Sequence, residues 1–213
     1  MQTWEINNHI LEFDEETHTY ICDGLIMPSV TQILKSKFDD YAGVPQHLME
    51  QASIKGTALH KAIEIYEKTG QTSDLKEFRN YLFIKKHKGF KNISNELPII
   101  YEENGKVLYA GQLDQIIEID GHLEINDFKR VSAPNKEKIA YQLNLYKLGY
   151  EQSYHKQIAG LNFTQLREDV RKFTPLPINE EKAKELIKEY YGGLRWAKKH
   201  KNLLQFYSKK LRN

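Results

Sequence analysis

The chain has 213 residues, and its 31 Lys and Arg against 29 Asp and Glu leave a formal net charge of +2. This length suits one domain, and 40% hydrophobic with 28% charged residues describes a globular chain rather than a disordered or fibrous one. The near balance of charge excludes a uniformly basic coat, although a nucleic-acid footprint can still be local.

The cysteine content and the apolar runs bound the class further. A single cysteine, Cys22, excludes a disulfide framework, a four-cysteine zinc site and a cysteine-ligated iron–sulfur cluster. The chain opens on a polar segment and holds no run of 18 apolar residues, so we expect neither a signal peptide nor a membrane span. The expectation is a soluble, cytoplasmic protein with no membrane partner.

The first part of the chain predicts a β-rich segment. Strand-like residues bounded by turn signals lie at 3–13, 17–22 and 25–27. Ser29 with Gln32 three residues later has the spacing of a capping box and indicates a helix start. Helices are then expected over 45–68, interrupted or loosened near Gly56, and over 74–88.

The rest of the chain alternates strands and helices. Three strands joined by the tight turns Asn104-Gly105 and Asp120-Gly121 are expected at 96–103, 106–119 and 122–130. The elements after them are a helix, two strands and a second helix, at 136–150, 158–166, 170–176 and 179–200.

This order predicts a mixed α/β fold, in which a mixed central β-sheet is flanked by α-helices and preceded by the N-terminal β-rich segment. We expect one domain over 1–213. Its parts are N-terminal strands with a short helix at 1–44, a core at 45–178, and a basic C-terminal helix at 179–213.

The hairpin around Asp120-Gly121 carries the clearest chemistry. A two-residue turn there places Asp114 opposite Asp127, and Lys129 projects from the same face two residues on. Two opposed carboxylates repel, and a divalent cation such as Mg²⁺ would relieve the repulsion while leaving positions for water and phosphate oxygens. With Lys129 to stabilise charge on a phosphate, the set suits metal-dependent phosphodiester hydrolysis. The alternative is a strand whose charges are simply solvated.

Two helices carry further candidates. His60 and Glu64 lie four residues apart, so the imidazole can ligate a metal and Glu64 can orient it or a bound water. Gln142 and Tyr146 also lie four apart, and can hydrogen-bond a phosphate or the lysine. A surface ion pair and ordinary packing are the respective alternatives. Glu96 is a weaker candidate, because a one-residue bulge decides which face of the sheet it takes.

The C-terminus is basic and aromatic. From Tyr190 onward there are seven Lys and Arg and no acid, and removing that stretch leaves the remainder acidic. Lysines neutralise phosphates and aromatic rings stack on unpaired bases, so the segment suits single-stranded DNA or free ends. The alternative is a solvated helix with packed aromatics. The candidate DNA-binding residues are Arg195, Trp196, Lys198, Lys199 and Lys201.

The order of these motifs resembles the RecB-like branch of the PD-(D/E)XK nuclease superfamily, in particular phage-encoded and mitochondrial single-domain exonucleases. The resemblance covers about 17–150 and rests on Gly56-x-x-x-His60-x-x-x-Glu64, Glu96, Gly111-x-x-Asp114, Asp127-x-Lys129 and Gln142-x-x-x-Tyr146. Leu113 stands where the superfamily has proline, and Asp127 replaces the commoner glutamate. The single cysteine puts the cluster-bearing subtype in doubt.

The resemblance implies a restriction-endonuclease-like core and a Mg²⁺-dependent deoxyribonuclease, most simply an exonuclease of phage recombination or replication. Mn²⁺ would substitute, no iron–sulfur cluster is expected, and DNA and a single-strand annealing or binding protein are the implied partners. His60, Asp114, Asp127 and the Phe128 carbonyl would bind the metal. Lys129 would be the catalytic lysine, supported by Gln142 and Tyr146. A nucleic-acid-binding module without the chemistry and a structure-specific endonuclease remain alternatives.

Overall fold

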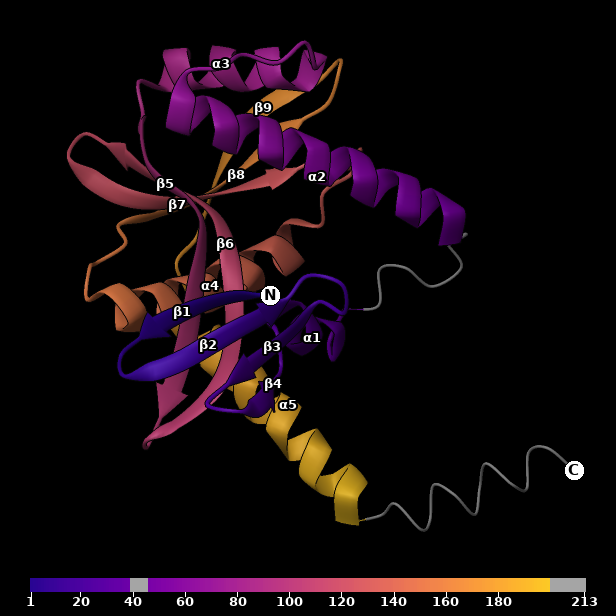
Figure 1. The fold of residues 1–213 in the computed structure, drawn as a ribbon, viewed down its shortest axis with the longest axis vertical. Coiled ribbons are helices and arrows are strands. Elements are labelled where there is room, and N and C mark those ends of the chain that lie inside the picture. Colours follow the sequence, from indigo (N-terminus) through magenta and orange to yellow (C-terminus); the bar gives the residue numbers. More distant parts are fainter. Residues whose placement is uncertain (39–45, 200–213) are drawn as a thin grey trace, which may run out of the picture.

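The computed structural model describes residues 1–38 and 46–199, and the side chains within 1–38 and 54–193. The chain begins with an antiparallel four-stranded sheet, coloured indigo in Figure 1, whose strands follow one another in sequence order. The strands are β1 (Gln2–Ile6), β2 (His9–Asp14), β3 (Thr19–Cys22) and β4 (Leu25–Met27).

A hairpin turn divides the single strand that the sequence predicts at 3–13. Asn7 and Asn8 have φ of 51° and 64°, the left-handed conformation that two-residue hairpin turns require and that asparagine tolerates. The chain therefore folds back on itself, and Ile6 pairs with His9.

The second sheet has the order β5-β6-β7-β8-β9, and all neighbours are antiparallel except β7 and β8. It is the mixed sheet that the sequence predicts. Its strands are β5 (Lys91–Glu103), β6 (Lys106–Ile119), β7 (His122–Lys129), β8 (Gly160–Leu166) and β9 (Arg171–Leu176). The expected register around Asp120-Gly121 is confirmed, because Ile119 pairs with His122 and Ile116 with Ile125.

The described helices are α1 (Val30–Lys35), α2 (Gln46–Thr69), α3 (Lys76–Lys88), α4 (Lys136–Tyr154) and α5 (Glu180–Lys199). The capping box is confirmed, since Ser29 accepts from the Gln32 N–H and Gln32 caps Ser29 in return. The interruption expected near Gly56 is wrong: α2 runs through it, because one glycine costs a long helix only about 1 kcal/mol.

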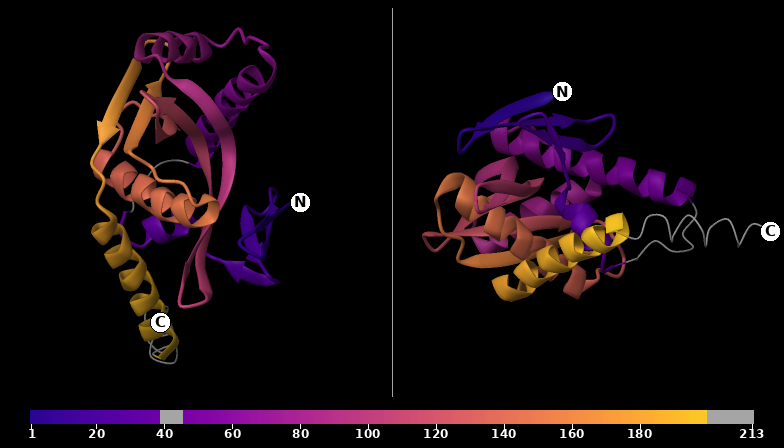
Figure 2. Two further views of the ribbon diagram at one scale, coloured as in Figure 1. Left: turned by 90° about the vertical axis from the view of Figure 1, so that its left-hand side faces the viewer. Right: turned by 90° about the horizontal axis from the view of Figure 1, so that it is seen from below.

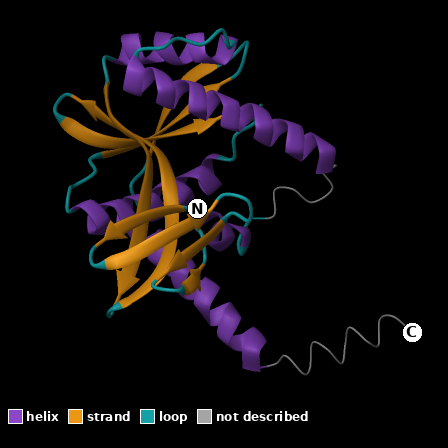
Figure 3. Ribbon diagram, viewed as in Figure 1, coloured by secondary structure: helices purple, strands orange, loops and turns teal. Residues whose placement is uncertain are grey.

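Helices cover both faces of the second sheet (Figures 2 and 3). On one face, Leu59 and Ile63 of α2 pack with α3 against Phe128 of β7. On the other face, α1, α4 and α5 share a larger core with the sheet, in which Leu143 of α4 and Ile116 are fully buried. Within 1–38 and 46–199, no helix is both long and apolar enough to cross a membrane.

The two sheets meet at the long strands β5 and β6. Ile100 and Ala110 of these strands belong to the apolar cluster under the N-terminal sheet. The Ala110 N–H donates to the Pro28 carbonyl, and Ser29 bridges to Ala110, so the segment before α1 is fixed beside β6. This contact places α1 next to the strand that carries Asp114.

Candidate metal centre

The pairing between β6 and β7 ends one residue before Asp114. The last pair is Gln115–Asn126, whereas on its other side β7 stays paired with β8 through Asp127 and Phe163. Beyond that point an Asp114 carboxylate oxygen accepts the Phe128 N–H at 2.7 Å. The predicted register is confirmed as far as Gln115–Asn126, and the predicted direct pair of Asp114 with Asp127 lies one residue past the end of the ladder, where a side chain takes the place of the backbone acceptor.

Gln112, two residues before Asp114, pairs with Pro98 of β5. Its side-chain amide donates to the Glu96 carbonyl at 3.0 Å. This contact matters because Glu96 has φ of 51°, a conformation that costs an ordinary residue about 1–2 kcal/mol. Glu96 lies between the pairs Asn95–Gln115 and Leu97–Leu113, and so faces Asp114 in the register.

His60 of α2 completes a cluster with these two acids. Its Nδ1 lies 3.5 Å from Glu96 Oε1 and 3.7 Å from Asp114 Oδ1. Donor atoms of the three residues all lie within 4.8 Å of one another. The Phe128 ring holds the imidazole edge-on, with 5.3 Å between ring centroids. The sequence named all three residues separately, and the fold brings them together.

The cluster concentrates charge with little water. Burial alone would lower the pKa of His60, but the charges of Asp114 and Glu96 outweigh it and raise that pKa to about 9. Burial raises the pKa of Asp114, with a further rise from Glu96, although His60 and Lys129 act against both. In the absence of a metal, a protonated His60 therefore compensates the two carboxylates at neutral pH.

Asp127 and Lys129 form the second part of the site. The Asp127 side chain is 2% exposed, and its Oδ2 makes an ion pair with the Lys129 ammonium group. Burial raises the pKa of Asp127, Lys129 opposes this rise, and Asp114 adds to it. The charge of Asp127 also raises the pKa of His60, as expected for a carboxylate beside the cluster.

Gln142 and Tyr146 approach this centre from α4. The Gln142 amide contacts the Tyr146 hydroxyl at 3.5 Å, and burial with the charges of Asp114 and Asp127 raises the pKa of Tyr146 well above its ordinary value. Gly111 permits the approach: a Cβ there would lie 3.1 Å from the Tyr146 ring. Gly111 belongs to the motif Gly111-x-x-Asp114, and the close packing against Tyr146 explains why a residue without a side chain stands at this position.

Several predicted residues lie elsewhere or serve another contact. Glu64 pairs with Lys68 at 2.6 Å and Lys61 at 3.0 Å on its own helix. The Phe128 N–H binds Asp114, and a role for its carbonyl stays a prediction. The side chains of Arg195, Trp196, Lys198 and Lys199, and all of Lys201, lie outside the described part of the chain.

A second group of donors lies in the N-terminal sheet, where His9, Cys22 and Asp23 are close together. His9 Nδ1 lies 2.5 Å from Asp23 Oδ2, and its Nε2 lies 3.3 Å from Glu102 of β5. Cys22 is 2% exposed within an apolar cluster, and burial raises the pKa of its thiol to about 11. The hydrogen bonds of His9 are therefore complete, and it ties the two sheets together.

The donors around His60 suit a hard or borderline divalent cation. Two carboxylates and one imidazole are ligands that Mg²⁺ and Mn²⁺ accept, and Mn²⁺ tolerates nitrogen better. The distances from His60 Nδ1 to the two carboxylate oxygens exceed the usual length of a hydrogen bond. The backbone of Glu96, which faces Asp114 in the register, is in a strained left-handed conformation. Both features fit a site built to share a cation.

Comparisons with known proteins do not assign the chain to a family. No family model matches the chain, and no curated protein matches it in sequence. A solved structure titled "Crystal structure of SSO0001" is similar at 15% identity and a TM-score of 0.45, covering 76% of this chain and 73% of that one. The two sheets and their helices thus define a mixed α/β protein, and its chemistry must be argued from the site.

Proposed function

We propose that the protein is a metal-dependent DNA nuclease that hydrolyses phosphodiester bonds, built on a restriction-endonuclease-like core. The observation that supports this most is the convergence of His60, Glu96 and Asp114 beside the Asp127–Lys129 ion pair. These residues come from α2, β5, β6 and β7, far apart in sequence. The order of their motifs, similar to RecB-like exonucleases, supports an exonuclease acting in phage recombination or replication.

Each residue has a chemical role in this proposal. His60, Glu96, Asp114 and Asp127 would hold Mg²⁺ or Mn²⁺, which, when bound, supplies Lewis-acid stabilisation of charge on a phosphate. Lys129, held by buried Asp127, places an ammonium group at the site to stabilise negative charge as it develops on phosphate oxygens. Gln142 and Tyr146 present an amide and a hydroxyl that can orient the phosphate.

The test is a digest in Mg²⁺ of linear DNA labelled at either end and of a closed circle. Asp114→Asn should lower cleavage at least about 10³-fold, as expected when an electrostatic element of a transition state is lost. Asparagine keeps an oxygen to accept the Phe128 N–H, so the fold should persist. Asp120→Asn is the matched control, because Asp120 lies exposed in the turn of the same hairpin.

The products separate the alternatives. Stepwise release from one labelled end with an uncleaved circle identifies an exonuclease, whereas cleavage of the circle identifies an endonuclease. DNA binding without cleavage in Mg²⁺ or Mn²⁺ would identify a binding module and contradict the proposal. Equal cleavage by wild type and Asp114→Asn would contradict the site.

A further inference from the structure

A groove of about 550 Å³ opens beside the candidate metal centre. It lies where the end of α1, the loop after β7 and the start of α4 meet, and Lys129 and Gln142 belong both to the centre and to the groove wall. A ligand in the groove would therefore be continuous with one at the centre.

The described residues that line the groove carry positive charge and no acid. Lys35 lies exposed in the last turn of α1, and Lys138 lies partly buried in the first turn of α4. With Lys129 they bring lysines from three elements, α1, β7 and α4, to the lining, and Thr31 adds a hydroxyl. Apolar side chains such as Leu34 and Ile139 form the floor.

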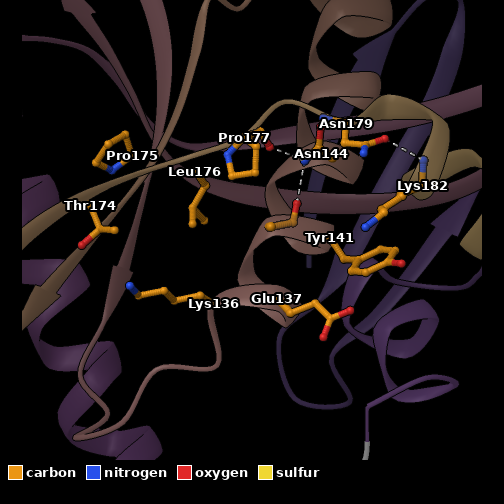
Figure 4. Close-up of a pocket in the computed structure, with 11 residues that line it drawn as sticks. Lys136, Glu137, Tyr141, Asn144, Thr174, Pro175, Leu176, Pro177, Asn179 and Lys182 are labelled. Carbon is orange, nitrogen blue, oxygen red and sulfur yellow. Dashed lines mark hydrogen bonds between the residues drawn. The ribbon is translucent and has the colours of Figure 1, made fainter.

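A second cavity, of about 420 Å³, lies between α4, β9 and the start of α5 (Figure 4), and it differs from the groove in having an acid in its lining and no residue of the candidate centre. Glu137 lies beside Lys136 and Lys182 in its lining, and Leu176 and Pro177 make much of its wall. It shares no lining residue with the candidate centre. Lys182, which is exposed in its lining, therefore offers a control position for the lysines of the groove.

We infer that the groove binds the phosphodiester backbone of one nucleic-acid strand next to the bond that is cleaved, with Lys35 and Lys138 each contacting a phosphate. This inference rests on the proposed function. Ammonium groups that neutralise phosphates release condensed counterions. The release of these counterions supplies most of the affinity for nucleic acid that does not depend on sequence. The groove thus positions the strand, and the metal centre acts on it.

The experiment measures the affinity of a fluorescein-labelled single-stranded DNA by anisotropy across a salt series. The proteins carry Asp114→Asn, so that the probe stays intact in Mg²⁺. Adding Lys35→Glu and Lys138→Glu should weaken binding by on the order of 100-fold and flatten the slope of log K against log salt by about 1.4, for two phosphate contacts. Adding Lys156→Glu and Lys182→Glu, an equal change of charge at exposed positions, should leave affinity within about threefold.

Folding is controlled separately. Glutamate at position 138 suits the first turn of α4, where the helix dipole favours acids, whereas glutamate at position 35 lies in the last turn of α1, where it favours cations. The two effects oppose each other, so the double variant should melt near the parent. Lys35→Ala with Lys138→Ala gives a milder version that should lose about tenfold. In the wild-type background the same pairs should raise KM while kcat changes little, because the contact is made in both ground and transition states.

The outcomes distinguish the groove from the proposed function. If the wild type cleaves DNA but reversal of Lys35 and Lys138 leaves affinity, salt slope and KM unchanged, the groove inference is overturned and the nuclease assignment stands. An equal loss in the Lys156 and Lys182 control would also overturn it, since net charge alone would then explain the effect. If the wild type neither binds nor cleaves DNA, both are overturned.

Discussion

Two histidines in this protein each lie between two carboxylates, and their surroundings differ. His9 uses both ring nitrogens, at 2.5 Å to Asp23 and 3.3 Å to Glu102, and both acids are substantially exposed. His60 turns a single nitrogen toward Glu96 and Asp114, at 3.5 and 3.7 Å, and the acids are 28% and 14% exposed. Both ring nitrogens of His9 thus have hydrogen-bond partners, whereas the distances around His60 leave space for an ion between the imidazole and the two carboxylates.

The difference shows how a structural ion pair and a candidate ligand set can be told apart. Hydrogen bonds at 2.5 and 3.3 Å join the sheets through His9. Asp23 also has a positive φ, of 49°, but it lies with Gly24 in a two-residue hairpin turn, where aspartate tolerates this conformation. Around His60, two partly buried carboxylates lie near each other and Glu96 adopts a left-handed conformation. Strain and charge repulsion persist where the surrounding structure over-determines them, which is common at functional sites.

The largest expected effect separates the two histidines directly. His60→Gln should weaken Mn²⁺ binding by about 100-fold, because a metal ligand is lost and the carboxylates lose their imidazole partner. His9→Gln should leave Mn²⁺ affinity within about twofold. Isothermal titration of both variants measures this, and equal losses would show that the distinction drawn from the distances is wrong.

The pH dependence should sharpen the contrast. The pKa of His60 is raised to about 9, so below that pH a cation must displace its proton. Mn²⁺ affinity should therefore rise up to about tenfold per unit between pH 6 and 8 and level off near pH 9. In the His60→Gln variant the rise should be much smaller. A flat profile in the wild type would contradict a protonated His60.

A smaller effect tests the strained backbone. Glu96→Asn should stabilise the metal-free protein by about 0.5–1 kcal/mol, since asparagine tolerates the left-handed region and the like charge is removed. The same change should weaken Mn²⁺ binding about tenfold. His155→Asn, at the left-handed C-cap of α4, is the control and should stabilise without altering metal affinity. Thermal unfolding with EDTA and with Mn²⁺ separates the two effects, and a destabilised Glu96→Asn protein would argue against strain.

The smallest effect concerns His9. The hydrogen bond to Asp23 raises the pKa of His9, burial opposes this rise, and Glu102 adds to it. A raised folded-state pKa contributes stability that is complete below about pH 6.5 and is lost as pH rises through the folded value. His9→Gln should thus cost about 0.5 kcal/mol at pH 6 and almost nothing at pH 9, in line with a partly exposed pair. Denaturant melts at both pH values check this, and a loss that grows with pH would contradict it.

The sequence predicted much of the frame and the identity of the clustered residues. Turn residues and alternation predict the β6–β7 register, and the spacing of Ser29 and Gln32 predicts the capping box. Five early residues of β5, from Lys91, escaped notice because they are largely polar and extend β5 only by pairing with β6. Tertiary pairing here overrides a weak local preference.

The geometry of the site was harder to predict. Nothing local shows that β6 and β7 part at Asp114, because that depends on a side chain accepting the Phe128 N–H. The left-handed Glu96 and its support by Gln112 likewise arise from contacts between strands. Sequence patterns fix which face a residue takes, while the final orientation of a buried charge follows from the whole electrostatic environment.

The most direct test of the metal centre is a crystal soaked in Mn²⁺, with anomalous diffraction recorded near the manganese edge. The account predicts a single strong peak between His60 Nδ1, Glu96 and Asp114, in contact with a carboxylate oxygen of each acid, and no peak at His9, Cys22 and Asp23. A peak at the N-terminal group alone, or none near His60 at saturating Mn²⁺, would contradict it.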